Sequence, residues 1–195
     1  MPQVKIGVLI SGSGTNLQSL IDNIENENIN GKITVVISNK KDAYGLERAR
    51  QKNIDTVYVN YKDYESFDKF NDAIIEELKS YGVELVVLAG YLKILTSKFI
   101  EEYSNRIINI HPSLIPSFCG KGYYGIKIHE EVINYGVKLS GATVHFVDEG
   151  ADTGPIIIQE AVEVCYDDTA EALQKKILKI EHKILPLAVK YYCEG

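Results

Sequence analysis

The sequence is poor in the residues that mark secreted, metal-binding and nucleic-acid-binding proteins. It has three cysteines in 195 residues, and Cys119, Cys165 and Cys193 form neither an even set nor a C-x-x-C pair. A disulfide framework and a zinc site are therefore not predicted. Lysine and arginine total 21 against 27 aspartates and glutamates, which gives a formal net charge of -6. This acidic balance argues against a broad nucleic-acid-binding surface.

Long hydrophobic runs are also missing. The longest, over residues 85–92, is much shorter than the roughly 20 residues of a membrane-spanning helix. The apolar stretch over residues 4–10 lacks a basic leader and continues into Ser11 and Gly12, which predicts a strand and not a secretory signal. We therefore expect no membrane contact and a reduced, cytoplasmic environment. The 45% hydrophobic and 25% charged content is typical of a globular protein, and the length predicts one domain over residues 1–195.

Short apolar runs alternate with longer amphipathic segments along the chain. Strands are predicted over residues 4–10, 33–38, 56–60, 85–89 and 106–110, and helices over 16–28, 44–52, 64–81 and 97–103. This alternation predicts a Rossmann-like parallel sheet with helices on both faces. Further on, a helix is predicted over 126–135, strands over 142–147 and 155–164, and a last helix over 169–192. The short loop between the last two strands predicts that they pair antiparallel, so the expected α/β sheet is mostly parallel with an antiparallel C-terminal portion.

A glycine-rich segment, Ser-Gly-Ser-Gly-Thr-Asn over residues 11–16, separates the first strand from the first helix. Glycines there let backbone N–H groups face an anion, and the helix N-terminus adds partial positive charge. Leu17 replaces the third glycine of the dinucleotide fingerprint, and no acid follows the second strand, so NAD is not predicted. We expect a phosphate ligand. A glycine turn capped by Thr15 or Asn16 is the alternative.

Asn109 and His111 are two residues apart at the predicted end of a strand, just before Pro112. In an extended chain they point to the same side, and open α/β sheets bind ligands at this end of their strands. An amide donor beside an imidazole suits a reaction that builds an oxyanion and moves a proton. A merely hydrogen-bonded histidine in a strand-end turn is the alternative.

The acidic loop over residues 148–154 contains the third candidate. Asp148 and Glu149 are expected to face solvent, whereas Asp152, at a strand entrance, is expected to turn inward. Paired with His111, it would orient the imidazole and favour the charged form. The remaining histidines are weaker candidates: His145 near the loop is expected in the second layer or the core, His129 at the surface of a helix, and His182 on a solvated helix face.

Taken together, six segments resemble the phosphoribosylglycinamide formyltransferases, a folate-dependent family of purine synthesis. They are residues 8–18, 38–40, 43–49, 87–95, 109–116 and 141–147. The Asn-x-His-Pro-Ser-Leu motif marks the wider folate formyltransferase superfamily, and Ser-Gly-x-Gly-Thr-Asn-Leu with the short length points to this member. The resemblance extends to the Glu181-His182 pair, so one catalytic domain is implied.

The resemblance implies transfer of a formyl group from 10-formyltetrahydrofolate to the amine of glycinamide ribonucleotide, through a tetrahedral intermediate. By similarity Asn109 and His111 would hold the formyl oxygen, with His111 as proton donor and Asp152 tuning it. The ribose phosphate would bind at Gly14, Thr15, Asn16 and Glu181. Folate-binding positions by similarity are Leu92, Lys93, Ile94, Leu95, Asn109, Asp148, Glu149, Gly150, Ala151 and Asp152. Small-molecule substrates, no metal, no NAD, and a monomer or homodimer are expected.

Two segments depart from the family pattern. Tyr64 stands where many members have an arginine for the glutamate tail of folate, with Lys62 or Lys69 as possible substitutes, and residues 118–126 are long and aromatic. Other folate enzymes remain alternatives: methionyl-tRNA formyltransferase normally has an extra C-terminal domain and basic surface, and formyltetrahydrofolate hydrolase normally has a preceding regulatory domain. A non-enzymatic phosphometabolite-binding module would explain the glycine loop but not the convergence of Asn109, His111 and Asp152.

Overall fold

A computed structural model describes residues 2–195. One seven-stranded sheet, in the order β3-β2-β1-β4-β5-β6-β7, forms its centre. The strands are β1 (Val4–Ile10), β2 (Gly31–Ser38), β3 (Asp55–Tyr58), β4 (Leu85–Leu88), β5 (Ile107–His111), β6 (Leu139–Phe146) and β7 (Ile156–Glu163). The first five pair parallel, whereas β5 with β6 and β6 with β7 pair antiparallel. The predicted α/β fold class is confirmed.

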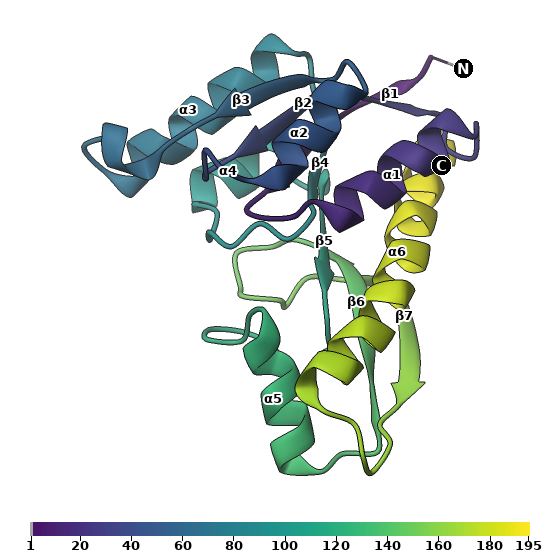
Figure 1. Ribbon diagram of the computed structural model, residues 1–195. Coiled ribbons are helices and arrows are strands. Elements are labelled where there is room, and N and C mark those ends of the chain that lie inside the picture. Colours follow the sequence, from purple (N-terminus) through teal and green to yellow (C-terminus); the bar gives the residue numbers. More distant parts are fainter. Residues whose placement is uncertain (1) are drawn as a thin grey trace.

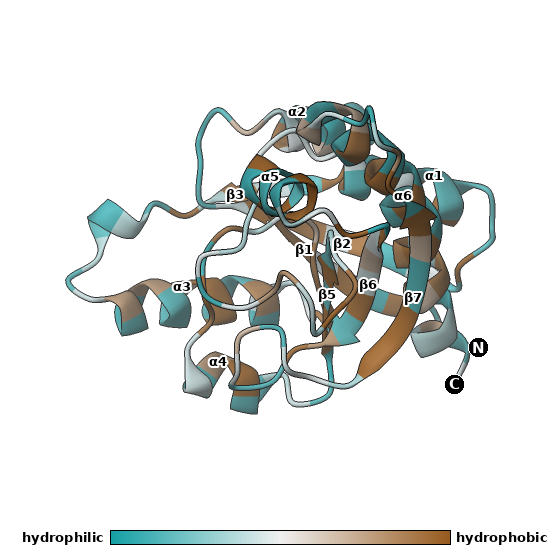
Figure 2. Ribbon diagram, turned by 90° about the horizontal axis from the view of Figure 1, so that it is seen from below, coloured by the Kyte–Doolittle hydropathy of each residue, from teal (hydrophilic) through white to brown (hydrophobic). Residues whose placement is uncertain are grey.

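Helices cover both faces of the sheet (Figure 2). One layer consists of α1 (Thr15–Glu25), α2 (Tyr44–Gln51), α5 (Ile126–Tyr135) and α6 (Ala170–Glu194). The other consists of α3 (Phe67–Ser80) and α4 (Ser97–Glu102), with a short 3-10 turn, η1 (Tyr61–Asp63), before α3. The long α6 lies beside α1 and crosses β6 and β7 (Figure 1). It thereby connects the antiparallel strands with the helix that follows β1.

The core is divided into two clusters by the sheet. In β1, Val8 packs with the cluster under α1, α2, α5 and α6, whereas Leu9 packs with the cluster under α3 and α4. Both side chains are fully buried, as the period-two alternation of a strand covered on both faces requires. Full burial of one such side chain contributes about 1.5–3 kcal/mol, so the two clusters hold the sheet rigid where it carries the site.

Helix ends differ modestly from the predicted ones, and caps explain the differences. The third helix begins at Phe67 and not at residue 64, because the Ser66 side chain accepts a hydrogen bond from the N–H of Lys69 and caps it there. The first helix ends at Glu25, and Glu27 then adopts a positive φ of 57°. Periodicity predicts which residues face the core, but not where a cap stops the helix.

The carboxyl ends of β1, β4 and β5 lie side by side. From β1 the strands β2 and β3 are added toward one edge of the sheet, and from β4 onward strands are added toward the other edge. Open α/β folds bind ligands at such a switch point. Ser11 connects the segments that leave these strands. Its N–H donates to Gly90 O (3.1 Å), its hydroxyl donates to Asn39 Oδ1 (2.7 Å), and it accepts from the Leu92 N–H (2.9 Å). The glycine loop and the segment after β4 are thus held at one edge.

None of the helices in residues 2–195 combines the length and apolar character needed to cross a membrane.

Gly14 and Gly12 should respond differently to alanine. Gly14 has φ +70°, and an added Cβ would lie 2.5 Å from Gly45 Cα, whereas a Cβ on Gly12 would meet nothing within 4 Å. Since a left-handed residue with a side chain costs about 1–2 kcal/mol, Gly14→Ala should lower the free energy of unfolding by at least that amount. Gly12→Ala should change it by less than about 0.5 kcal/mol. Urea denaturation followed by circular dichroism measures both, and equal stability of the two variants would contradict the packing described.

Candidate active site

Asn109 and His111 lie at the carboxyl end of β5, as predicted. Ile108 and Ile110 pack into the cluster under α1, α2, α5 and α6, so the alternation of the strand turns Asn109 and His111 to the opposite side. The antiparallel register places Asn109 across from His145 and His111 across from Thr143. His111 is 5% exposed, so its chemistry is set by the few groups that touch it.

The imidazole of His111 lies between two hydrogen-bond acceptors. Its Nε2 is 3.0 Å from the carbonyl oxygen of Phe118, and its Nδ1 is 3.6 Å from Asp152 Oδ2. A carbonyl can only accept, so Nε2 carries the proton in the neutral ring and Nδ1 then faces a carboxylate. A second proton on Nδ1 would therefore be well placed.

Burial opposes that second proton. Desolvation lowers the pKa of His111 below its ordinary value, and the charge of Asp152 and the Phe118 carbonyl raise it without cancelling the effect. The expectation that Asp152 favours the charged form is right in sign, but burial is the larger cause. The resting ring is mainly neutral at neutral pH and can accept a proton during a reaction.

His145 takes part in the same cluster. Its Nδ1 lies 2.8 Å from the Phe146 carbonyl oxygen and therefore carries the proton, which leaves Nε2 free to accept from Asn109 Nδ2 at 3.1 Å. One N–H of the Asn109 amide is thus held in place. The second N–H remains for another acceptor, such as the oxygen of a carbonyl compound.

Asp152 bridges the two histidines from the loop between β6 and β7. Besides its contact with His111, it lies 3.6 Å from His145 Nε2 through Oδ1, and Oδ2 accepts from the Gly120 N–H at 2.9 Å. Burial raises the pKa of Asp152, but the polar groups around it, including the Gly120 N–H, outweigh burial and lower the pKa overall. Asp152 is therefore an ionised carboxylate in a largely buried site. It adopts a positive φ of 60°, a conformation that favours its inward turn.

Two backbone groups of the site carry no signal in the sequence. The Phe118 carbonyl and the Gly120 N–H come from the aromatic segment over residues 118–126, which folds over the end of β5. Backbone partners depend on the path of the chain and not on side-chain type, so no motif could have indicated them.

The glycine loop and the last helix meet although they are far apart in sequence. Asn16 Nδ2 donates to Glu181 Oε2 at 2.6 Å, and both side chains are buried. Burial raises the pKa of Glu181, while the bond from Asn16 opposes the rise. Within residues 2–195, the Asn16 Oδ1 atom is buried without a hydrogen-bond partner. The predicted phosphate-binding residues Gly14 and Thr15 directly precede Asn16 in the sequence.

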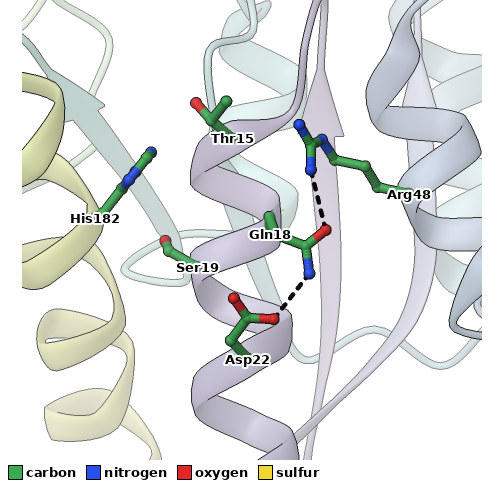
Figure 3. A pocket seen from close by; sticks show the side chains of 6 residues that line it. All are labelled: Thr15, Gln18, Ser19, Asp22, Arg48 and His182. Carbon is green, nitrogen blue, oxygen red and sulfur yellow. Dashed lines mark hydrogen bonds between the residues drawn. The ribbon is translucent and has the colours of Figure 1, made fainter. Parts of the chain in front are cut away.

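A cavity of about 210 Å³ adjoins the loop on the outer side of α1 (Figure 3). Its polar lining comes from three helices: Thr15, Gln18, Ser19, Asp22, Arg48 and His182. His182 is half-buried and not on a solvated face, and burial lowers its pKa, with a smaller effect of the Arg48 charge. The structure therefore adds Arg48 and His182 to the surroundings of the phosphate candidate.

The segment after β4 leaves the sheet beside Asn109, which pairs with Leu88. Leu92 and Ile94 are 54% and 71% exposed, whereas Leu95 is buried in the core. Two exposed apolar side chains next to a polar cluster suit a flat, partly apolar ligand. In the loop over residues 148–152, the Asp148 carboxylate accepts from the N–H of Gly150 and the hydroxyl of Thr153, which shapes the backbone that carries Asp152.

Two expectations need correction or refinement. His129 is not at the surface: it is 1% exposed on the inner side of α5, where burial and the nearby His111 lower its pKa to about 4. His129 shares the buried side of the helix with Ile128 and Val132, which are fully buried. Tyr64 packs against Phe70 with ring centroids 6.1 Å apart, while Lys62 and Lys69 are exposed and Lys93 Nζ lies 5.4 Å from the Tyr61 ring centre.

In residues 2–195, no group of three or more histidine, cysteine, aspartate or glutamate side chains is placed to hold a metal ion.

A family model described as "Formyl transferase" matches residues 4–189. The chain belongs to this family. It is 44% identical to a Haemophilus influenzae protein named phosphoribosylglycinamide formyltransferase, over 98% of this chain and 88% of the relative. The crystal structure of glycinamide ribonucleotide transformylase 1 from Symbiobacterium toebii superimposes with a TM-score of 0.94 and 46% identity, covering 99% of this chain and 89% of that one.

Other formyl transferase relatives are longer. The chain is 40% identical to the chloroplastic phosphoribosylglycinamide formyltransferase of Arabidopsis thaliana, over 97% of this chain but 65% of the relative. In the trifunctional purine biosynthetic proteins adenosine-3 of Chironomus tentans and Bos taurus it spans 14% and 19% of the relative's length. The same unit therefore occurs within larger proteins.

Asp152→Asn should lower the pKa of His111 further, because it removes the negative charge 3.6 Å from Nδ1 while burial remains. NMR titration of the imidazole signals measures this shift. Asp167→Asn removes the same charge at an exposed turn far from the site and should leave the His111 pKa unchanged. A His111 pKa that is identical in wild type and Asp152→Asn would show that the carboxylate does not act on the ring.

Proposed function

We propose that this formyl transferase moves a formyl group from 10-formyltetrahydrofolate to the amine of N1-(5-phospho-D-ribosyl)glycinamide, a step of de novo purine synthesis. The carrying observation is the nearly full-length match to a protein of that name, 44% identical over 98% of this chain. The convergence of Asn109, His111 and Asp152 around one buried cluster supports the same chemistry. No metal and no NAD take part in the proposed reaction.

The reaction sets three requirements for the site. The amine must attack as a neutral nucleophile, the formyl oxygen gains negative charge when the new C–N bond forms, and a proton must move from the attacking nitrogen to the departing folate nitrogen. A positioned donor for the oxyanion and a group that accepts and returns a proton meet the last two. Such donors act most strongly where water is largely excluded.

Asn109 and His111 take these roles in the proposal. The free N–H of the Asn109 amide donates to the formyl oxygen, and the bond from Asn109 to His145 keeps that amide from rotating. His111, neutral at rest, receives the proton of the attacking amine and returns it to the folate nitrogen as the old C–N bond breaks. Asp152 stabilises the imidazolium that exists between the two transfers.

Groups that lie away from the reacting atoms hold the substrates. The N–H groups at Gly14, Thr15 and Asn16 bind the phosphate, and Glu181 keeps Asn16 in place while accepting from a ribose hydroxyl. Leu92, Lys93 and Ile94 flank the folate on one side, and the loop over residues 148–152 on the other. Leu95 supports this wall from the core. The proposed partners are small-molecule substrates. The protein is proposed to act on them as a monomer or homodimer in the cytoplasm.

Turnover tests the proposal directly. The purified chain, supplied with 10-formyltetrahydrofolate and the ribosylglycinamide phosphate, should release tetrahydrofolate and the formylated amide in equal amounts, as measured by mass spectrometry. Methionyl-tRNA and water should serve as poor acceptors in parallel reactions. Transfer to methionyl-tRNA, or hydrolysis at a comparable rate, would instead identify another activity of the superfamily.

Variants of the catalytic cluster should lose turnover and keep binding. His111→Ala and Asp152→Asn should each lower kcat by about 100-fold or more, as expected for loss of a positioned proton-transfer or oxyanion group. The KM values should change little. The double variant should be only slightly slower than the slower single one, because the two residues act as a unit. A folded Asp152→Asn protein with nearly wild-type kcat would exclude the assigned role.

A further inference from the structure

We propose that Arg48 of α2 is a positioning residue for the phosphate loop and supplies its positive charge. The inference rests on the proposed function and extends it to a residue outside the segments that touch the reacting atoms. In the loop over residues 12–14, the backbone carbonyls accept hydrogen bonds, whereas within residues 2–195 the backbone N–H groups donate none.

Each of the three backbone carbonyls in this loop accepts a hydrogen bond from another part of the protein. Gly12 O accepts from the N–H of Gly45, and Gly14 O accepts from the N–H of Gln18. Ser13 O accepts from Arg48 Nε at 2.9 Å. Arg48 thus supplies the bond to Ser13 O that no backbone N–H makes.

The N–H groups of the same stretch are left open. Within residues 2–195, Gly12, Ser13 and Gly14 donate no backbone hydrogen bond, and the N–H groups of the first turn of α1 have no intrahelical acceptor. With all three carbonyls engaged by the protein, the N–H groups of the loop remain available to an anion. If Ser13 O were released, its partial negative charge could rotate toward the ligand.

Arg48 is itself held in one orientation. Its Nη1 donates to Gln18 Oε1 at 3.2 Å, and Gln18 Nε2 donates to Asp22 Oδ1 at 2.8 Å (Figure 3). The guanidinium carbon also lies 5.0 Å from the ring centre of Tyr44. A side chain fixed on three sides loses little entropy when an anion binds.

Further polar groups beside the loop lack a partner. The guanidinium lines the 210 Å³ cavity together with the side chains of Thr15 and Ser19. In the described part of the chain, His182 Nε2, across the cavity, and Asn16 Oδ1, at the start of α1, are buried without a hydrogen-bond partner. Buried polar atoms are normally satisfied, so these two mark a region whose polar contacts the protein alone leaves incomplete. A phosphorylated sugar offers the anion for Arg48.

A comparison of two substrates tests the role. Arg48→Met should raise the KM for the phosphorylated ribosylglycinamide about tenfold, with kcat within about twofold of wild type and the KM for the folate unchanged. For the same substrate without its phosphate, kcat/KM should be equal in both proteins. Arg48→Lys keeps the charge but not the forked geometry, and should give an intermediate loss.

Arg50→Met is the matched control. Arg50 lies on the same helix, is exposed, and within residues 2–195 forms an ion pair only with Glu47, at 3.7 Å. The variant therefore loses the same charge without changing the loop, and should keep wild-type constants. An equal loss of kcat/KM toward both substrates in Arg48→Met would assign Arg48 a merely structural role. Unchanged kinetic constants would overturn the inference while the proposed function stands. Calorimetry with ribose 5-phosphate separates the two proposals: weaker binding to Arg48→Met supports the inference even in a chain that forms no formylated product, and equal binding overturns it.

Discussion

The antiparallel register between β5 and β6 determines the geometry of the candidate site. It places Asn109 across from His145 and His111 across from Thr143. A shift of one residue would turn Asn109 and His111 into the apolar cluster beneath α1 and α6 and bring isoleucines to the site. Thr143, fully buried, fixes the chain just beyond His111, because its hydroxyl donates to Ser113 O and accepts from the N–H of Ile115. The loop that carries Asp152 then follows directly from β6.

Burial and charge act against each other in this cluster, and the outcome suits proton transfer. Burial alone would make His111 a poor base, and a fully exposed carboxylate partner would act weakly through water. In the observed arrangement Asp152 is ionised and held by the Gly120 N–H, while His111 remains neutral beside it. A proton that arrives on the imidazole meets a ready counter-ion. A proton that leaves returns the site to its resting state at little cost in reorganisation.

Much of the fold and of the site follows from local pattern. Strand alternation predicted the shared side of Asn109 and His111, and the parallel units predicted the edge at which they lie. The family was identified from motifs and is confirmed by the full-length match. What local pattern missed depends on tertiary packing: the burial of His129, the Phe118 carbonyl at His111, and the link from Arg48 to Ser13. The individual roles of the site residues stay predictions.

The hydrogen bond between Asn16 and Glu181 joins residues 165 positions apart. The start of the first helix is therefore complete only after the last helix has been synthesised and has docked. During translation, which proceeds from the N-terminus, the glycine loop can form early, whereas its carboxylate neighbour arrives last. A ligand that contacts both residues would bind only the chain with α6 in place, and would stabilise that docking by mass action. Binding of such a ligand and docking of α6 are in this way thermodynamically coupled.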